Sequence, residues 1–223
     1  MNEVVIEKDN VQTIEKTSIK IYPYIKRAFD FSFALICSLF FIPIMLIVIL
    51  LIRIDSKGPA IFTQDRIGKD GKTIKIYKFR TMVMNAEEEL KRLLETDPKI
   101  REEYTVYKKI TNDPRLTKIG GFLRKASIDE LPQILNILKG EMSLIGPRPY
   151  LHRELPDMEG YEKYITAFRP GLTGMWQVNG RNETTFQERL EFDQEYYQKF
   201  SVKLDTKIFF KTIQAVFKKD GAK

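Results

Sequence analysis

The longest apolar run of the chain covers residues 31–52, where 22 consecutive residues carry no charge. A helix of this length can span the hydrocarbon core of a bilayer. Pro43 lies in the middle of the run and removes one helix hydrogen bond, so we expect a kink there. The pattern therefore predicts a membrane-embedded helix, which we place within residues 21–56.

The charges beside this run bear on its topology. Basic residues stand on both sides, with Lys26 and Arg27 before the run and Arg53 and Lys57 after it. By the positive-inside rule, basic residues on both sides favour a topology in which both ends of the segment stay on the cytoplasmic side. We therefore expect a re-entrant helix that bends at Pro43 and returns to the cytoplasmic face, with an ordinary kinked span as the alternative.

Shorter periodic segments follow the apolar run. Residues 60–66 and 73–79 alternate in polarity around a Gly-Lys-Asp-Gly turn, which predicts a β-hairpin. Helical periodicity runs from residue 85 to 109 with an interruption at Pro98. A further helix is predicted from residue 129 to 139, where Gly140 would stop it.

The two ends of the chain differ in pattern. Residues 1–20 are mixed polar and begin with acids, so we expect a flexible tail and no signal peptide. Near the C-terminus an apolar stripe is flanked by lysines, which predicts a basic amphipathic helix for an anionic membrane surface, or else a packing helix. The stripe consists of Leu204, Ile208, Ile213, Val216 and Phe217, and the lysines are Lys203, Lys207, Lys211, Lys218 and Lys219.

Together these elements predict an α+β, mainly helical fold. Residues 1–20 form the tail, and residues 21–56 form the membrane re-entrant helix kinked at Pro43. Residues 57–223 form a small cytoplasmic catalytic domain with a short β-hairpin and interfacial amphipathic helices.

Composition narrows the possible functions. The formal net charge of +7 favours an anionic partner, which could be nucleic acid, a membrane surface or a phosphorylated substrate. Cys37 is the single cysteine and His152 the single histidine, which excludes an intramolecular disulfide and sites built on paired imidazoles. No basic aromatic stripe appears, so we expect no nucleic acid partner.

The segment Arg-Lys-Ala-Ser-Ile-Asp-Glu-Leu-Pro-Gln contains the adjacent acids Asp129 and Glu130. One interpretation is a helix capping box, with Ser127 as the N-cap and Glu130 as its partner. The other is chemical. A carboxylate at a helix N-terminus near Arg124 should have a lowered pKa and stay ionised, and an ionised aspartate can attack phosphorus. The second carboxylate could then bind Mg²⁺.

Basic residues suited to phosphate occur in two further motifs. Pro147 and Pro149 flank Arg148, which a stiff loop would therefore present to a ligand. Lys78 and Arg80 are two apart on a predicted strand and so share one face. The alternatives are a structural arginine in the first motif and an exposed charged strand edge in the second.

Three motifs, "KFRTM", "RKASIDELPQILNILKGEMSLIGPRP" and "RPGLTGMWQVNGRN", stand in this order along the chain. They resemble the monotopic phosphoglycosyl transferases, bacterial sugar transferases that load a hexose-1-phosphate onto polyprenyl phosphate. The resemblance extends over about residues 24–219. It implies an enzyme at the inner membrane, facing the cytoplasm, that acts on a UDP-sugar with Mg²⁺ and releases UMP.

The resemblance also assigns roles. Asp129 would be the nucleophile that forms a covalent aspartyl-phosphate sugar intermediate, and Glu130 the main Mg²⁺ ligand, with Asp129 as a further candidate ligand. The candidate substrate-binding residues are Lys78, Arg80, Arg124, Pro147, Arg148, Pro149, Arg169, Gln177, Asn179 and Arg181. One departure is Ile42 before Pro43, where family members often carry serine; Ser38 is the nearest preceding hydroxyl.

The expected partners are a UDP-sugar, polyprenyl (undecaprenyl) phosphate and membrane lipid, with a homodimer left open. The reaction would be the first membrane step of exopolysaccharide, capsule or glycoconjugate synthesis. A membrane-anchored scaffold protein is the alternative from another class, and UMP release from a UDP-sugar would distinguish the two.

Overall fold

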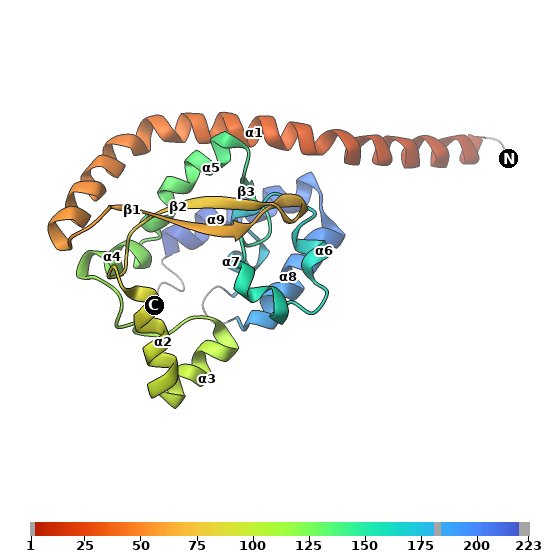
Figure 1. The fold of residues 1–223 in the computed structure, drawn as a ribbon. Helices are drawn as coiled ribbons and strands as arrows, with labels where there is room; N and C mark the ends of the chain where they lie inside the picture. The colour runs from red at the N-terminus through yellow and green to blue at the C-terminus, as the bar shows by residue number, and fades with distance from the viewer. Residues whose placement is uncertain (1–2, 181–183, 219–223) are drawn as a thin grey trace.

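The computed structural model describes the backbone of residues 3–180 and 184–218, and the side chains of residues 21–180 and 184–215. The α-helices are α1 (Glu3–Asp55), α2 (Ala86–Thr96), α3 (Pro98–Tyr107), α4 (Lys118–Lys125), α5 (Ile134–Lys139), α6 (Glu162–Ile165), α7 (Met175–Asn179), α8 (Phe186–Lys199) and α9 (Val202–Lys218). The 3-10 helices are η1 (Lys69–Gly71), η2 (Ile128–Gln133) and η3 (His152–Asp157), and the strands are β1 (Ile61–Ile67), β2 (Thr73–Phe79), β3 (Ser143–Ile145) and β4 (Gly171–Thr173). The mainly helical α+β fold is confirmed (Figure 1).

Helix α1 contains the apolar run. Its part from Ile21 to Asp55 is the one helix of the described residues that is long and apolar enough to cross a membrane, with a mean hydropathy of 3.2. Only 11% of the most apolar window is buried, so this helix is not a core helix of the kind found in soluble proteins. Leu39, Phe40 and Ile54 are among its exposed side chains. Such a surface is suited to lipid.

The helix is continuous through Pro43. Figure 1 shows α1 running along one side of the molecule and turning, in its orange part, toward β1. The hydroxyl of Ser38 donates to the carbonyl oxygen of Leu35 at 2.6 Å, so it does not serve the Leu39 carbonyl that a proline at position 43 leaves without a donor. The return of the helix to one membrane face stays a prediction.

Helix α1 begins at Glu3, whereas the sequence pattern predicted a flexible tail over residues 1–20. Residues 1 and 2 lie outside the described part. The division of the chain into tail, membrane helix and catalytic domain 57–223 therefore stays a prediction as well.

The predicted hairpin is confirmed. β1 and β2 pair antiparallel with Ile61 opposite Phe79 and Ile67 opposite Thr73. β3 and β4 form a separate parallel pair. Helices α2 and α3 carry a small apolar cluster of their own and lie on the side of the molecule away from α1 (Figure 1).

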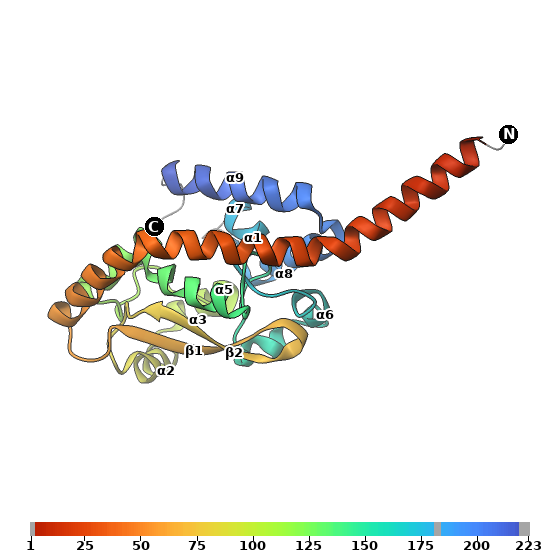
Figure 2. The same cartoon turned by 90° about the horizontal axis from the view of Figure 1, so that it is seen from above.

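Helix α9 lies beside α1 (Figure 2). Phe209 packs edge-on against Phe33 of α1, with ring centroids 5.7 Å apart. Ile208 of the predicted apolar stripe is buried, whereas Phe210 and Ile213 are exposed. The stripe therefore divides between packing on the core and exposure, and the side chains of Val216 and Phe217 lie outside the described part.

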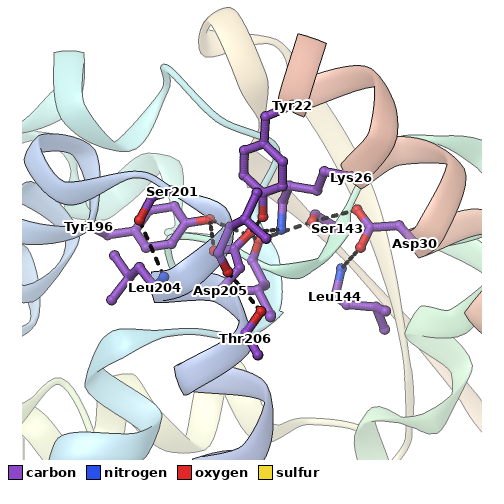
Figure 3. A network of polar contacts seen from close by, with 12 residues as sticks. Tyr22, Lys26, Asp30, Ser143, Leu144, Tyr196, Ser201, Leu204, Asp205 and Thr206 are labelled. Carbon is purple, nitrogen blue, oxygen red and sulfur yellow. Dashed lines mark hydrogen bonds and ion pairs between the residues drawn. The ribbon is translucent and has the colours of Figure 1, made fainter. Parts of the chain in front are cut away.

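A buried carboxylate joins α9 to α1 (Figure 3). Asp205 accepts hydrogen bonds from the hydroxyl of Tyr22, from Nζ of Lys26 at 2.6 Å and from the hydroxyl of Tyr196 at 2.8 Å. These donors come from α1 and α8. A buried charge is tolerated when it is paired and hydrogen-bonded in this way. The contact fixes α1 against the rest of the fold.

A second buried carboxylate, that of Asp30 in α1, bonds β3. Oδ2 of Asp30 accepts from Oγ of Ser143 at 2.6 Å, and Oδ1 accepts from the backbone N–H of Leu144 at 3.2 Å (Figure 3). β3 leads directly into the Pro-Arg-Pro loop. The apolar helix is thereby connected to the segment that carries Arg148.

Candidate active site

The acidic pair lies on an irregular segment and not in the first turn of an α-helix. Ser127 has φ 55° and its side chain makes no capping hydrogen bond, so the predicted capping box is wrong. The segment from Ile128 to Gln133 is a 3-10 helix, and the α-helix begins only at Ile134. Pro132 explains the difference, since it lacks an N–H and disfavours the α conformation of the residue before it. Gly140, with φ 81°, ends the helix as predicted.

A buried asparagine holds this segment against the hairpin. Asn136 is fully buried, and its amide nitrogen donates to the carbonyl oxygen of Lys75 at 2.8 Å, while its amide oxygen accepts from the N–H of Tyr77 at 3.1 Å. The amide therefore bonds the outer edge of β2 as a neighbouring strand would. This contact sets the distance between β2 and the acidic pair.

Lys78 on β2 reaches the pair. Its Nζ lies 2.7 Å from Oε1 of Glu130, and this hydrogen-bonded ion pair is partly exposed. Asp129 is more enclosed, with 9% of its surface exposed. The two neighbouring carboxylates thus differ in burial, and only Glu130 forms an ion pair with Lys78.

Burial raises the pKa of Asp129 to about 6. The charge of Lys78 opposes this rise, Glu130 adds to it, and Arg124 again opposes it. The sequence pattern predicted a lowered pKa from a helix N-terminus, and that prediction is wrong because the residue lies in no α-helical first turn and is desolvated. The carboxyl group is nevertheless mostly ionised at pH 7.

The pKa of Glu130 shifts in the opposite direction. Burial tends to raise its pKa, but the Lys78 ammonium, then Arg148 and a hydrogen bond from Gln133, hold it below the usual range. Two adjacent carboxyl groups with separated pKa values are a recurring sign of divided roles. Here Glu130 is the more acidic and Asp129 the more basic group.

Arg124 comes from the end of α4. Its Nε donates to the hydroxyl of Thr81 at 3.0 Å, which orients an otherwise exposed side chain, and its charge acts on Asp129. The structure thus brings Arg124, Lys78 and the acidic pair together.

The Pro-Arg-Pro loop supplies the next cation. The carbonyl oxygen of Pro147 accepts from the N–H of Gly171 at 2.8 Å, and that of Pro149 accepts from a guanidinium N–H of Arg66 at 3.0 Å. The backbone N–H of Arg148 lies 3.4 Å from Oδ2 of Asp193. Hydrogen bonds therefore hold the loop on both sides of Arg148. The positive charge of Arg148 lowers the pKa of Glu130.

Two other predicted arginines lie elsewhere. The guanidinium of Arg80 bonds the carbonyl oxygens of Ser56 and Lys57, at the C-terminal end of α1. Nε of Arg169 donates to the carbonyl oxygen of Gly140 at 2.7 Å. Among the described residues neither forms an ion pair with the acidic pair, and both stabilise carbonyl groups at helix ends.

Two of the remaining candidates, Gln177 and Asn179, lie in α7. Asn179 accepts from Nζ of Lys211 at 2.8 Å and lines a hollow of about 320 Å³ together with Glu188, Glu191 and Glu195. This acidic lining is unsuited to a phosphate. Gln177 lies in the same helix, and Arg181 lies outside the described residues.

The donor set for a divalent cation is small. In the described part of the chain no three His, Cys, Asp or Glu side chains come together as a metal-binding group. Mg²⁺ typically uses one or two carboxylates together with substrate phosphate oxygens and water. Asp129 and Glu130 fit that pattern, with Glu130 the more accessible of the two.

The sequence analysis missed Asn136, Gln133 and Thr81. The one signal for Asn136 was a polar residue within the apolar run Ile-Leu-Asn-Ile-Leu. Neither Thr81 nor Gln133 stands out in sequence. Thr81 acts through its hydrogen bond with Arg124, which is distant along the chain, and Gln133 acts through its hydrogen bond with Glu130 one turn away.

Comparison with known proteins places these residues in a family. Residues 21–219 match the model of the family described as "Bacterial sugar transferase". The chain is 44% identical over 199 residues to "UDP-galactose-lipid carrier transferase" of Erwinia amylovora, which covers 89% of this chain and 42% of the relative. It is 40% identical over 200 residues to "UDP-glucose:undecaprenyl-phosphate glucose-1-phosphate transferase" of Escherichia coli, with 85% and 39% covered.

A relative closer in length is "Exopolysaccharide production protein ExoY" of Rhizobium meliloti, 42% identical over 191 residues, with 86% of this chain and 84% of the relative covered. The chain spans less than half the length of the other two relatives. The family match covers nearly the whole chain. The protein belongs to the bacterial sugar transferase family.

Proposed function

We propose that the protein transfers a hexose-1-phosphate from a UDP-sugar to polyprenyl phosphate and releases UMP. The observation that carries this proposal is the acidic pair, in which Asp129 is buried and Glu130 is paired with Lys78 at 2.7 Å. Family membership and the printed names of the relatives supply the substrate class. Those names include both galactose and glucose.

The first step is a displacement at phosphorus. A carboxylate oxygen of Asp129 attacks the sugar-bearing β-phosphorus, the bond from that phosphorus to the bridging oxygen breaks, and UMP leaves with the bond's electron pair. UMP departs as a phosphate, so a strong general acid is unnecessary. The arrangement lowers the repulsion between anions through Arg124, Lys78 and Arg148, whose charges act on the acidic pair.

The second step regenerates the carboxylate. An oxygen of polyprenyl phosphate attacks the phosphorus of the aspartyl phosphate, and the Asp129–phosphorus bond breaks. The acceptor phosphate has a second pKa near ~6 and is largely dianionic at neutral pH, so it needs no general base. Two separate half-reactions predict ping-pong kinetics.

Glu130, with Asp129, is the residue that would hold Mg²⁺. When bound, the ion would neutralise charge that develops on the phosphate oxygens. Lys78 would then orient Glu130 for this role, since its ammonium group contacts one of the two carboxylate oxygens.

The assay that tests the proposal measures UMP release by the full chain in detergent or nanodiscs, with a panel of UDP-sugars, undecaprenyl phosphate and Mg²⁺. We expect release with one or a few UDP-sugars and a lipid-linked sugar diphosphate as the second product. No release from any UDP-sugar would favour the scaffold alternative.

We also propose that α1 is re-entrant and that the catalytic residues face the cytoplasm. The basic residues on both sides of the apolar run support this placement. Cysteine variants at Ser18 and Lys57, in a background where Cys37 is replaced by Ala, should both react with a membrane-impermeant maleimide added from the cytoplasmic side. Labelling from opposite sides would show that α1 spans the membrane.

The raised pKa of Asp129 predicts the pH dependence of the first step. Protonation below about pH 6 removes the nucleophile, so the rate of UMP release should fall to roughly a tenth at pH 5. Replacing Lys78 by Met removes a cation that lowers this pKa, and the acid limb should move to higher pH. A single-turnover profile that stays flat between pH 5 and 8 would contradict the assignment.

A further inference from the structure

One buried arginine bonds the C-terminal end of α1. Arg80 is 5% exposed and comes directly after β2. Its guanidinium donates to the carbonyl oxygen of Lys57, to the carbonyl oxygen of Ser56 at 2.8 Å and to the hydroxyl of Ser56 at 3.0 Å. The last carbonyl groups of a helix have no donor within the helix, so an arginine placed here satisfies them and fixes the end of α1.

Two further contacts secure this end of the helix. Oδ2 of Asp55 accepts from the backbone N–H of Ile119 in α4 at 3.2 Å. Gly58 has φ 115°, and a Cβ at this position would collide with the guanidinium of Arg80. Glycine therefore leaves the space that the arginine occupies. We call residues 55–58 and Arg80 the α1 joint.

An apolar cluster connects the same end of α1 to the segment that carries the acidic pair. Ile52 of α1, Phe79 of β2 and Leu123 of α4 are buried in this cluster. Ile128 and Leu131 of η2 pack against it, and in sequence they stand on either side of the acidic pair. Close-packed interiors transmit displacements, so the position of α1 bears on the position of η2.

The joint also lies next to two cations of the candidate active site. Lys78, two residues before Arg80, is paired with Glu130 at 2.7 Å. The hydroxyl of Thr81, the residue after Arg80, accepts from Nε of Arg124 at 3.0 Å. One short segment of chain therefore bonds the end of α1 and two groups of the candidate active site.

Strand β2 has its own supports apart from the joint. It pairs with β1 along its whole length from Thr73 to Phe79, and the buried amide of Asn136 bonds its other edge. Removal of the Arg80 guanidinium should therefore leave Lys78 in place and loosen the end of α1 instead.

We infer that Arg80 is a positioning residue for the lipid half of the reaction. This inference rests on the proposed function. The acceptor phosphate is tied to the bilayer by its polyprenyl chain, so it reaches Asp129 only if the acidic pair lies at the right depth. α1 is the helix suited to lipid, and Arg80 fixes its end against the acidic pair. A soluble UDP-sugar has no such constraint.

The test uses the full chain in nanodiscs that contain undecaprenyl phosphate, with the variants Arg80→Met and Arg80→Lys. Methionine fills much of the buried space but donates no hydrogen bond, and lysine keeps the charge but lacks the planar fork. A misplacement of about 1 Å can cost ~10²-fold in rate. We expect kcat/KM for undecaprenyl phosphate to fall roughly ten-fold in Arg80→Met and about three-fold in Arg80→Lys.

The donor substrate provides the internal comparison. In ping-pong kinetics, kcat/KM for each substrate depends only on its own half-reaction. In both variants kcat/KM for the UDP-sugar should therefore stay within two-fold of the parent value. A general loss of folded protein would lower both values equally, and that result would overturn the inference. A loss for the UDP-sugar alone would also overturn it and would assign Arg80 to donor binding.

Arg101→Met is the matched control. The guanidinium of Arg101 donates to the carbonyl oxygens of Leu94 and Glu95 at the end of α2, on the side of the molecule away from α1 (Figure 1). The substitution removes the same kind of contact without touching the α1 joint. Both values of kcat/KM should stay within two-fold of those of the parent protein, and thermal unfolding should show that every variant is folded at the assay temperature.

Hydrogen exchange tests the joint without any turnover. The backbone N–H of Ser56 donates to the carbonyl oxygen of Ile52 at 3.1 Å, and loosening of this turn exposes it to exchange. Exchange in residues 52–58 should be about ten-fold faster in Arg80→Met than in the parent protein and unchanged in Arg101→Met. Equal exchange rates in Arg80→Met and the parent protein would overturn the inference.

The outcomes for the two proposals are separate. A parent protein that releases no UMP from any UDP-sugar would contradict the proposed function, and faster exchange in Arg80→Met would then retain the joint as the contact that fixes α1. A parent protein that transfers sugar phosphate, while Arg80→Met keeps both values of kcat/KM, would contradict the inference alone.

Discussion

Replacing Asp129 by Asn is expected to lower UMP release at least about 10³-fold, to the background of the assay. The neutral amide has nearly the size of the carboxylate but cannot form the bond to phosphorus. The fold should tolerate the change, because burial disfavours the ionised form of Asp129 and raises its pKa to about 6. Membrane association and the unfolding temperature should therefore match those of the parent protein.

Asp70→Asn provides the control for this substitution. Asp70 is exposed, stands in the turn between β1 and β2 with φ 57°, and lies in a backbone conformation that asparagine also adopts readily. Its turnover should be unchanged. If Asp129→Asn retained near-normal turnover, a covalent mechanism through this residue would be excluded.

Replacing Asp205 by Asn is expected to destabilise the protein by about 3 kcal/mol. The carboxylate accepts from Tyr22, Lys26 and Tyr196, and the amide would leave the ammonium of Lys26 without the carboxylate it is paired with, in a largely buried position. Breaking one side of a buried ion pair typically costs this much or more. For a chain of this size, the unfolding temperature should fall by roughly 6–12 °C.

Fluorescence of the single tryptophan, Trp176, can follow this unfolding in detergent. Glu195→Gln on α8 is the matched control, since its pair with Lys199 is exposed and contributes at most ~0.5 kcal/mol. Equal unfolding temperatures for the two variants would mean that the Asp205 contacts do not hold α9 and α1 together.

Local pattern predicted the regular elements well. A hairpin was predicted from the alternating polarity of residues 60–66 and 73–79 and from the turn between them. Alternation with a period of two is the pattern of a strand, whose side chains point to opposite faces in turn. The helical segment is interrupted at Pro98 and α5 ends at Gly140. Both follow from the local backbone properties of proline and glycine. The motif of adjacent acids also marked Asp129 and Glu130 as candidate site residues, and their catalytic roles stay a prediction.

Sequence spacing failed where a contact crosses between elements. Lys78 and Arg80 are two residues apart, yet Lys78 reaches Glu130 while Arg80 bonds the end of α1. The strand ends at Phe79, so the expected shared face does not extend to Arg80. The Ser127 cap failed because Pro132 prevents an α-helical turn there.

The sequence by itself determined the apolar helix, the hairpin, the family motifs and the residue types needed for phosphate chemistry, because these depend on neighbours along the chain. The tertiary structure decided the electrostatics. The pKa of Asp129 rises because packing removes it from water, and Asn136 sets how β2 presents Lys78 to Glu130. Arg148 and Arg189 meet over Trp176 only because the loop after β3, α7 and α8 pack together, since charge interactions depend on distance in space and not on separation in sequence.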